Sequence, residues 1–527
     1  MRFKILFAAF FIFMAPVIHA QEAVQAYPNI IYVLADDMGY GDVSVYHPEN
    51  KIKTPHLDQL AREGMYFTDA HTSSSVCTPT RYGILTGRYN WRSTLKSGVL
   101  TGKSKALIPR ERTTVASMLK SKGYHTAFIG KWHLGWDWAL KDSLDTTGEG
   151  WNKEDFDIID FTRPVTNNPN DLGFDYSYGH SGSLDMAPYV YVENGRVTAL
   201  PDKFTVNKGK YSWWREGPTG SDFVHEKVTP HFFDKAAKYI DRALTVKQPF
   251  FLYLALPSPH TPILPSAEWQ EKSGLNPYGD FVMMIDHYMG ALHQKIKSAG
   301  LEANTLIIFT TDNGCSPAAG LEELAAKGHF PGAEFRGHKA DIFEGGHRVP
   351  FIVKWPEVVT PGTKVEDLIC TTDLMATLAD IVDYRLQDNE GEDSFSMLPL
   401  FEGNEKADEK RLSVVHHSIN GSFAFRKGNW KLITVPDSGG WSYPHPANDK
   451  EAIAQMPAFQ LYNLKDDPGE TMNLEEKYPE KVLELTSMLT DQIKKGRTTS
   501  GQEQTNDAID FEWHQIRFTT DQKKPSK

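Results

Sequence analysis

The feature that most constrains this chain is a series of short apolar runs, rich in β-branched and aromatic residues, that alternate with helical stretches. The runs show little alternation between apolar and polar residues, which is typical of strands buried on both faces of a sheet. They span Ile30–Ala35, Thr126–Gly130, Phe250–Leu256, Thr305–Thr311 and Val349–Trp355. The helical stretches span His56–Glu63, Thr113–Lys122, His231–Leu244 and Tyr278–Ser298. This order predicts an α/β fold with a mostly parallel sheet sandwiched by helices.

Polar side chains follow four of these runs, at the point where each predicted strand ends. The first run is followed by Asp36-Asp37, and the fourth by Asp312-Asn313. The second and third runs are followed by Lys131-Trp132-His133 and Ser258-Pro259-His260. Because ligands of open parallel sheets bind at the carboxyl ends of the strands, we expect these groups to share one crevice.

Asp36, Asp37, Asp312 and Asn313 offer oxygen ligands for a metal ion. Adjacent ionised carboxylates repel each other, and burying them together requires a cation. Oxygen ligands favour Ca²⁺ or Mg²⁺ over zinc. The alternative is that both pairs lie in solvated turns, which are also rich in Asp, Asn and Gly. Two pairs, each at the end of a buried strand, favour the metal site.

The segment from Ser75 to Arg88 carries the strongest chemical signal. Pro79 is suited to the first position of a helix, which would place Cys77 beside the free N–H groups of that terminus. Such a position would lower the pKa of the thiol and make Cys77 a nucleophile beside the cation Arg81. The alternative from local features alone is a small buried cysteine.

The run Cys77-Thr78-Pro79-Thr80-Arg81, followed by Leu85-Thr86-Gly87-Arg88, resembles the signature of the formylglycine-dependent sulfatases, the type I sulfatases of the alkaline-phosphatase-like superfamily. Thr80 stands where Ser is commoner in that family. The resemblance covers most of the chain and also rests on Asp36–Gly39, Gly130–Gly135, Ser258–Pro262, Thr311–Gly314, Gly345–Pro350 and Leu461–Pro468. It implies an alkaline-phosphatase-like fold and an exported bacterial carbohydrate sulfatase.

The resemblance also implies a mechanism. Cys77 would be oxidised to formylglycine (3-oxoalanine) by a formylglycine-generating maturation enzyme, and one hydroxyl of the hydrated aldehyde would attack sulfur. Residue 77 would share one Ca²⁺, or Mg²⁺, with the four oxygen ligands. The other residues implied to act are Arg81 and Lys131 in orienting the diol, Lys131 and Lys339 in neutralising sulfate, His133 as the base for sulfate release and His260 as the acid for the leaving alcohol.

The start of the chain is typical of an export signal. Arg2 and Lys4 precede the apolar run Ile5–Phe13, and Ala20 ends a stretch of small and apolar residues. We expect a signal peptide over residues 1–20 and a periplasmic or secreted product that no longer associates with a membrane. A membrane anchor is the alternative, although the run is short for a span.

The rest of the chain divides into two expected domains, a sulfatase catalytic domain over residues 21–390 and a smaller α+β domain over residues 391–527. Residues 141–220 are expected to form long loops over the sheet. The smaller domain is expected to carry a short antiparallel sheet and a terminal helix, over Ser413–His417, Phe423–Arg426, Trp430–Val435 and Tyr478–Lys494.

Composition excludes some classes of protein. The net charge of −12 argues against a general nucleic-acid binder. Three cysteines are too few for a disulfide scaffold, and the pairing of Cys315 and Cys370 stays open.

The expected substrate is a sulfated saccharide, with ulvan, carrageenan, fucoidan and glycosaminoglycan fragments as candidates. Five tryptophans in loop-like stretches, each equally suited to packing, are candidates for stacking on sugar rings: Trp136, Trp138, Trp213, Trp214 and Trp441. Two other functions stay open. One is a phosphodiesterase or phosphonate monoester hydrolase of the same superfamily, and the other is a sulfated-glycan-binding protein with unmodified Cys77.

Overall fold

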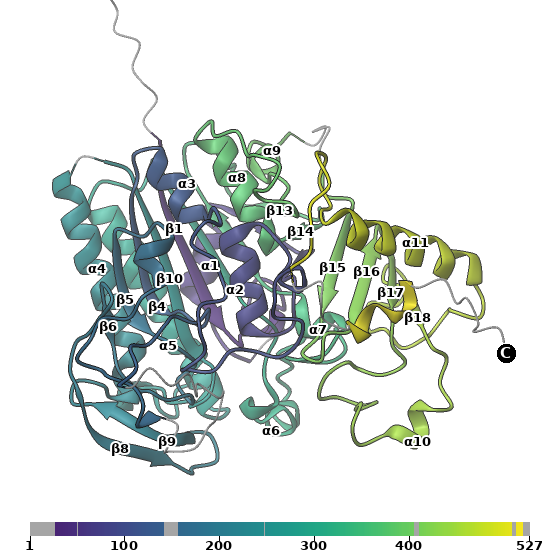
Figure 1. Cartoon of the computed structure of the whole chain (residues 1–527), viewed down its shortest axis with the longest axis horizontal. Helices are drawn as coiled ribbons and strands as arrows, with labels where there is room; N and C mark the ends of the chain where they lie inside the picture. The colour runs from purple at the N-terminus through teal and green to yellow at the C-terminus, as the bar shows by residue number, and fades with distance from the viewer. Residues whose placement is uncertain are drawn as a thin grey trace, which may run out of the picture.

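The computed structural model describes residues 27–49, 51–141, 156–246, 248–404, 410–507 and 513–519, so the expected signal peptide lies outside the described residues. Its largest element is a ten-stranded sheet in the order β13-β2-β12-β11-β1-β10-β4-β5-β6-β7 (Figure 1). In that order the strands span Thr363–Val365, Met65–Phe67, Phe351–Lys354, Thr305–Thr311, Asn29–Asp36, Phe250–Pro259, His125–Lys131, Tyr176–His180, Val192–Glu193 and Arg196–Val197. The five neighbours β11, β1, β10, β4 and β5 are all parallel, which confirms the predicted mostly parallel sheet.

The central strands are buried on both faces because helices cover the sheet on its two sides. α1 (Pro55–Glu63), α4 (Val228–Val246) and α5 (Pro277–Ser298) contact one another. α2 (Cys77–Thr86), α3 (Val115–Ser121) and α8 (Leu374–Ile381) form a second group of contacting helices. The four predicted helices are confirmed as α1, α3, α4 and α5, with ends that differ by up to three residues. Four further short helices are α6 (Leu321–Ala326), α7 (Glu344–His347), α9 (Leu398–Phe401) and α10 (Lys450–Ile453).

The run Val349–Trp355 does form a strand, β12, but it is antiparallel to both of its neighbours, β11 and β2. Its apolar composition reports burial and not direction, so the sequence alone favoured one more parallel strand. The end of β11 pairs with the start of β12, so the connection between them begins and ends at the same edge of the sheet.

The prediction of long loops over residues 141–220 is wrong in part. β5 pairs with β4 and extends the main sheet, and β6 and β7 follow at its edge. β8 (Pro201–Asn207) and β9 (Trp214–Gly220) form a separate antiparallel hairpin. These strands lack aliphatic runs, since β5 reads Tyr-Ser-Tyr-Gly-His and β8 is mostly exposed.

The C-terminal part contains the predicted antiparallel sheet, in which β15 (Ser413–His417), β16 (Phe423–Lys427) and β17 (Trp430–Ile433) were expected. A fourth strand, β18 (Gln460–Asn463), was not predicted. α11 (Pro479–Lys495) packs on β16 and β17. The hydrophobic core under this sheet includes Tyr89 and Trp91, which follow α2 in the sequence. A two-stranded sheet of β3 (Ala70–His71) and β14 (Ile369–Cys370) lies outside the main sheet.

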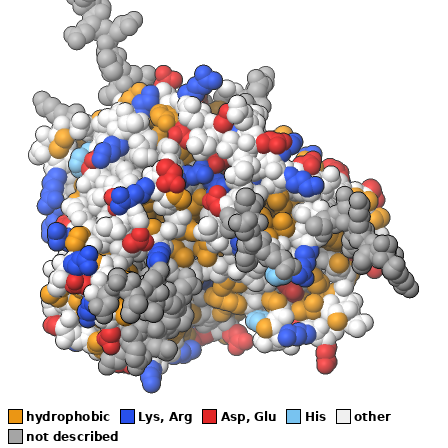
Figure 2. Space-filling model, viewed as in Figure 1, with side chains coloured by type: hydrophobic (Ala, Val, Ile, Leu, Met, Phe, Trp, Pro, Cys, Tyr) orange, Lys and Arg blue, Asp and Glu red, His pale blue; other side chains and the backbone are white. Residues whose placement is uncertain are grey.

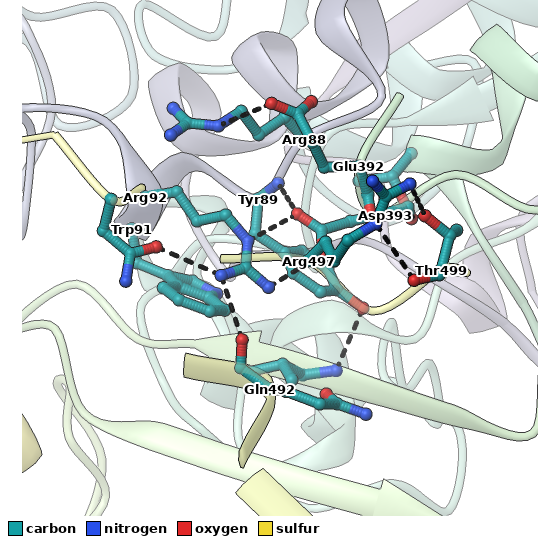
Figure 3. A network of polar contacts seen from close by, with 12 residues as sticks. Arg88, Tyr89, Trp91, Arg92, Glu392, Asp393, Gln492, Arg497 and Thr499 are labelled. Carbon is teal, nitrogen blue, oxygen red and sulfur yellow. Dashed lines mark hydrogen bonds and ion pairs between the residues drawn. The ribbon is translucent and has the colours of Figure 1, made fainter. Parts of the chain in front are cut away.

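A buried network of ion pairs and hydrogen bonds fixes the segment after α2 (Figure 3). Arg92 makes two hydrogen bonds to the carboxylate of Asp393, at 2.8 and 2.9 Å, and a third to the backbone oxygen of Gln492 in α11. Arg88 forms an ion pair with Glu392, with 3.3 Å between Nε and Oε1. The network therefore ties the segment after α2 to the C-terminal part of the chain.

No described helix has the length and apolar character that a membrane crossing requires. On the face shown in Figure 2, acidic and basic side chains are interspersed. That face therefore lacks the broad basic surface that neutralises nucleic-acid phosphates.

Candidate active site

The carboxyl ends of four neighbouring parallel strands meet at one edge of the sheet. Asp36 is the last residue of β1, and Lys131 is the last residue of β4. Asp312 follows β11 directly. The residues that follow these strands add Asp37, His133, His260 and Asn313, and all seven side chains are buried. The structure therefore brings the predicted strand-end residues into one place, as the parallel order requires.

Hydrogen bonds join Asp37 to Asn313 and to Asp312. The side-chain N–H of Asn313 donates to Asp37 at 2.7 Å, and the backbone N–H of Asp37 donates to Asp312 at 3.3 Å. Asp37 adopts a positive φ of 66°, which is rare for a residue with a side chain. Such backbone strain is typical of functional sites, where the surrounding structure enforces it.

Three buried cations neutralise the three carboxylates. Lys131 pairs with Asp36, and Lys339 Nζ lies 2.8 Å from the carboxylate of Asp37. The guanidinium of Arg81 donates to Asp312 from Nη2 at 2.7 Å and from Nε at 3.0 Å. A divalent cation added to this neutral set would leave a net charge of about +2, which suits an anionic substrate.

The ionisation of these carboxyl groups depends on one another. Burial raises the pKa of Asp36, but the charges of Lys131, His260 and Arg81 outweigh it and hold that pKa well below its usual range. Burial and the neighbouring charge of Asp36 raise the pKa of Asp312 to about 6. Opposite shifts are expected when two carboxyl groups share one buried site.

The donor set fits a hard divalent cation. The side-chain oxygen of Asn313 is fully buried and has no hydrogen-bond partner among the described residues. A buried amide oxygen without a donor is costly, so a cation is a natural partner for it. Asp36, Asp37, Cys77 and His260 also offer ligand atoms within 4.8 Å of one another.

Cys77 is the first residue of α2, and its sulfur lies 3.4 Å from a carboxylate oxygen of Asp36. The helix begins at Cys77 itself, two residues earlier than the expected start at Pro79. Every residue of α2 is buried, so residue 77 is held at the floor of the site.

The expectation of a lowered thiol pKa at Cys77 is wrong. Burial and the carboxylate of Asp312 raise the pKa of this thiol well above its ordinary value, despite the nearby Lys131. The helix terminus and the cations do not compensate for the loss of water. An unmodified Cys77 would therefore stay protonated and be a poor nucleophile.

Each of the two histidines has one ring nitrogen hydrogen-bonded to the backbone. Nε2 of His133 lies 2.7 Å from the carbonyl oxygen of Leu100, and Nδ1 of His260 lies 2.6 Å from that of Thr261. A carbonyl accepts only, so these nitrogens carry the protons. The other nitrogens, Nδ1 of His133 and Nε2 of His260, remain available for proton transfer.

A cavity of 370 Å³ opens onto these groups. Its lining contains Cys77, His133, His260 and Lys339 among the predicted residues. Asp36, Asp37, Lys131, Asp312 and Asn313 are not among the lining residues and lie beneath it, in contact with Cys77, Lys339 or one another.

Two of the five candidate tryptophans, Trp213 and Trp441, line this cavity. Trp136 and Trp138 are buried and stack edge-to-face against each other. The ring of Trp214 stacks on His225 with 3.9 Å between ring centroids. These three are packing residues, and the sequence could not separate the two groups because all five have similar local surroundings.

The cavity also has polar residues that the sequence did not single out. They include Ser183 and Asp185, which follow β5, and Arg215 in β9. The hydroxyl of Ser183 is buried and has no hydrogen-bond partner among the described residues. No local sequence pattern marked these residues. Recognition of β5 as a strand beside β4 would have pointed to Ser183 and Asp185, because they follow its carboxyl end.

A larger cavity of 720 Å³ lies apart from these groups, and its lining includes Tyr211, Asn276 and Glu323. Its polar side chains bind one another: Tyr211 donates to Glu323, and Asn276 donates to the backbone of Ala319 at 2.8 Å. None of the predicted site residues lines it, so size alone would have pointed to the wrong place.

Fold and site together define a hydrolase class in which buried carboxylates and cations surround one reactive side chain at the carboxyl edge of a parallel sheet. A family model described as Sulfatase matches residues 28–384. The chain is 33% identical to N-acetylgalactosamine-6-O-sulfatase of Bacteroides thetaiotaomicron, over 88% of this chain and 92% of that protein. It is 32% identical to human arylsulfatase A, over 86% and 84% of the two chains.

A solved structure from work on glycosaminoglycan metabolism in Bacteroides thetaiotaomicron superposes with a TM-score of 0.75 at 32% identity, over 88% of this chain and 99% of that one. The chain therefore belongs to the sulfatase family, and it is a sulfuric ester hydrolase. The resemblance to the type I sulfatases and the alkaline-phosphatase-like fold are both confirmed.

Proposed function

We propose that this sulfatase removes sulfate esters from a sulfated carbohydrate, with a formylglycine made from Cys77 as the nucleophile. The observation that carries the proposal is the position of Cys77. It lies at the first turn of a buried helix, in a cavity that also contains His133, His260 and Lys339.

The reaction needs three proton transfers, and each of the two histidines is suited to one of them. One hydroxyl of the hydrated aldehyde loses its proton to water and attacks sulfur, and the S–O bond to the sugar breaks as Nε2 of His260 protonates the leaving oxygen. Nδ1 of His133 then accepts the proton of the second hydroxyl, the bond between residue 77 and sulfate breaks, and the aldehyde is restored. Burial and the charge of Lys131 lower the pKa of His133, which keeps it neutral and ready as a base.

The buried cations orient and neutralise the reacting groups. Arg81 and Lys131 border the diol, and Lys131 and Lys339 balance the charge that develops on sulfate. A cation held by Asp36, Asp37, Asp312, Asn313 and residue 77 would polarise the sulfate oxygens. The hard oxygen ligands favour Ca²⁺, with Mg²⁺ as the alternative.

The substrate class follows from the relatives and from the cavity. One relative is named for N-acetylgalactosamine 6-sulfate, and the superposed structure comes from work on glycosaminoglycan metabolism. Glycosaminoglycan fragments and the algal polysaccharides ulvan, carrageenan and fucoidan all present such esters. We also propose that residues 1–20 direct export to the periplasm or beyond, where such polymers arrive. A maturation enzyme would convert Cys77 to formylglycine before the enzyme acts there.

The test compares Cys77→Ala with the native chain and with Cys370→Ala, which removes another buried free cysteine that does not line the cavity. Sulfate release from a panel of sulfated oligosaccharides is measured by ion chromatography, and the peptide across residue 77 is weighed by mass spectrometry. We expect Cys77→Ala to lose roughly 10⁴-fold or more in kcat while staying folded, and Cys370→Ala to keep the native rate.

The native peptide should have the mass expected when the CH₂SH group of cysteine becomes an aldehyde. An unconverted thiol in an active enzyme would contradict the formylglycine. Binding of the oligosaccharides without sulfate release would favour a glycan-binding protein. Faster turnover of phosphodiesters than of sulfate esters would favour a phosphodiesterase.

A further inference from the structure

Asp185 and Arg215 form an ion pair in the wall of the active-site cavity, beside His260. Nη1 of Arg215 pairs with Oδ2 of Asp185. The other carboxylate oxygen, Oδ1, is buried, has no hydrogen-bond partner among the described residues, and lies 3.9 Å from Nδ1 of His260. That nitrogen donates to the backbone, so it does not satisfy Asp185. A buried carboxylate oxygen without a donor is costly and is expected to receive one from a ligand.

The pair is held in place before any ligand arrives. The backbone N–H of Arg215 donates to the carbonyl of Asp185 at 3.3 Å, and Tyr189 donates its hydroxyl to the carbonyl of Arg215 at 2.7 Å. The preceding residue of the hairpin, Trp214, is fixed by its stacking on His225. The guanidinium of Arg215 also lies 5.1 Å from the ring centroid of Trp213, which lines the cavity.

The charges of the cavity wall indicate which group is bound. Apart from the histidines, the charged residues among those that line the cavity are Asp185, Arg215 and Lys339. Lys339 pairs with Asp37, and the Asp185–Arg215 pair is neutral overall. A sugar carboxylate would meet the free oxygen of Asp185 and be repelled, whereas a hydroxyl would donate to it and accept from Arg215.

We propose that Asp185 and Arg215 form a recognition subsite for a hydroxyl group of the sugar that carries the scissile sulfate, and that this sugar is neutral. The subsite lies next to His260, which protonates the leaving oxygen, so it positions the leaving group for that transfer. This inference rests on the proposed function and adds to it the class of sugar: a sulfated galactose or N-acetylhexosamine unit, and not a sulfated uronic acid.

The first experiment measures the native enzyme on three kinds of sulfate ester. They are galactose and N-acetylgalactosamine sulfated at position 3, 4 or 6, a 2-O-sulfated uronic acid disaccharide, and 4-nitrophenyl sulfate, which has no sugar. We expect the best neutral sugar sulfate to have a kcat/KM at least tenfold above that of the uronate. A preference for the uronate would overturn the inference alone, and release of sulfate from none of them would overturn the proposed function as well.

The second experiment compares Asp185→Asn and Arg215→Gln with the native enzyme, and uses Asp202→Asn as a matched control on the exposed part of the same hairpin. We expect each of the two variants to lower kcat/KM for the best sugar sulfate by roughly 10- to 100-fold, mostly through KM. The loss with 4-nitrophenyl sulfate should be much smaller, and Asp202→Asn should not change the ratio of the two rates.

A deoxy analogue of the best substrate completes the test. Removal of the recognised hydroxyl should cost the native enzyme about the same factor as Asp185→Asn, and should cost that variant nothing more. Equal losses on sugar and aryl sulfates in both variants would show a merely structural role. Circular dichroism and the melting temperature of each variant identify any that has failed to fold, and the analogue series on the native enzyme then decides.

Discussion

Asn313 shows how one atom can identify a site. Its amide N–H group is engaged by Asp37, while its oxygen is buried without a partner. Of the four oxygen ligands predicted from the sequence, it is the neutral one, so its geometry is not explained by ion pairing with Lys131, Lys339 or Arg81. A cation explains both the orphaned oxygen and the crowding of three carboxylates.

Replacing Asn313 should therefore weaken cation binding directly. We expect Asn313→Ala to raise the dissociation constant for Ca²⁺ by roughly 10- to 100-fold, measured by isothermal titration calorimetry on chelator-treated protein. The melting temperature of the native chain should fall on chelation and recover with Ca²⁺, because the cation binds the folded state. The exposed Asn429→Ala serves as the control. Native affinity in Asn313→Ala would remove this residue from the metal site.

At the scale of elements, α2 is unusual because it is buried over its whole length. A solvated helix could shift by part of a turn, but this one is fixed at both ends. At its start, Thr80 donates its hydroxyl to the carbonyl of Ser74 at 2.9 Å. Beyond its end, Arg88 and Arg92 are held by Glu392 and Asp393 (Figure 3). The position of residue 77 therefore depends on a part of the chain that lies 300 residues further on.

Breaking this network should destabilise the protein strongly. We expect Arg92→Met to lower the free energy of unfolding by about 3–5 kcal/mol in urea denaturation, because Asp393 is left buried and unpaired. The double variant Arg92→Met/Asp393→Leu should recover part of this loss. Lys481→Met, which removes an exposed pair with Glu484, should cost at most about 1 kcal/mol. A loss of that size in Arg92→Met would contradict the structural role of the network.

The backbones of β4 and β10 approach each other so closely at Gly130 that only a glycine fits there. Gly130 has a φ of 132°, and a Cβ atom there would lie 1.8 Å from the carbonyl oxygen of Ala255. No other residue fits this close approach of two strands. Lys131 is the next residue, so the same glycine helps to set the position of the Lys131 ammonium group in the active site.

At the scale of the whole molecule, a cluster of buried histidines joins the two-stranded sheet and α7 to the C-terminal sheet. His71 in β3 and His347 in α7 face each other with 3.1 Å between their Nδ1 atoms, and His416 in β15 stacks on His347. The two stacked rings lie 3.6 Å apart with only 10° between their planes. His71, Glu344, His347 and His416 offer ligand atoms within 4.8 Å of one another. The lone pairs of the two stacked rings point side by side rather than toward one point, which argues against a metal ion within this cluster.

The histidine cluster is neutral without any protonated ring. Its surrounding charges are Asp69, Glu344 and Glu470 against Arg348, Arg426 and Lys431. Burial lowers the pKa of His71, His347 and His416, in the latter two with help from neighbouring histidines. Burial also raises the pKa of Glu470 to about 7, against the opposing charge of Lys431.

These shifts predict that stability falls in acid. Below the ordinary histidine pKa of about 6.5, the unfolded chain binds protons that the folded chain refuses, so stability is highest above that value and falls as pH drops. Each histidine contributes up to about 1.4 kcal/mol per pH unit, and Glu470 opposes one of the three between about 4.5 and 7. Urea denaturation between pH 8 and pH 5 measures the slope.

The triple variant His71→Gln/His347→Gln/His416→Gln should have a shallower slope than the native chain, whereas His47→Gln, outside the cluster, should keep the native slope. The comparison concerns slopes and not absolute stability, so a general destabilisation of the triple variant does not affect it. An unchanged slope in the triple variant would show that other groups cause the acid sensitivity.

The sequence by itself determined the parallel sheet, five of the helices (α1, α3, α4, α5 and α11) and the polar residues at the strand ends. Each of these depends on neighbouring residues: Asp36, Lys131 and Asp312 lie where they do because the chain has just left a buried strand. The antiparallel direction of β12 was missed because its apolar composition reports burial and not direction. The strands within residues 141–220 were missed because they lack aliphatic runs.

Only the tertiary structure decided the surroundings of each side chain. The high thiol pKa of Cys77, the unpaired oxygens of Asn313 and Asp185, and the meeting of Trp213 with Trp441 in one cavity depend on residues that lie far apart in the chain. Burial and electrostatic energy are set by everything within a few ångströms, whatever its place in the sequence. A sequence therefore shows which groups are available for chemistry, and the fold decides what charge and which partners they have.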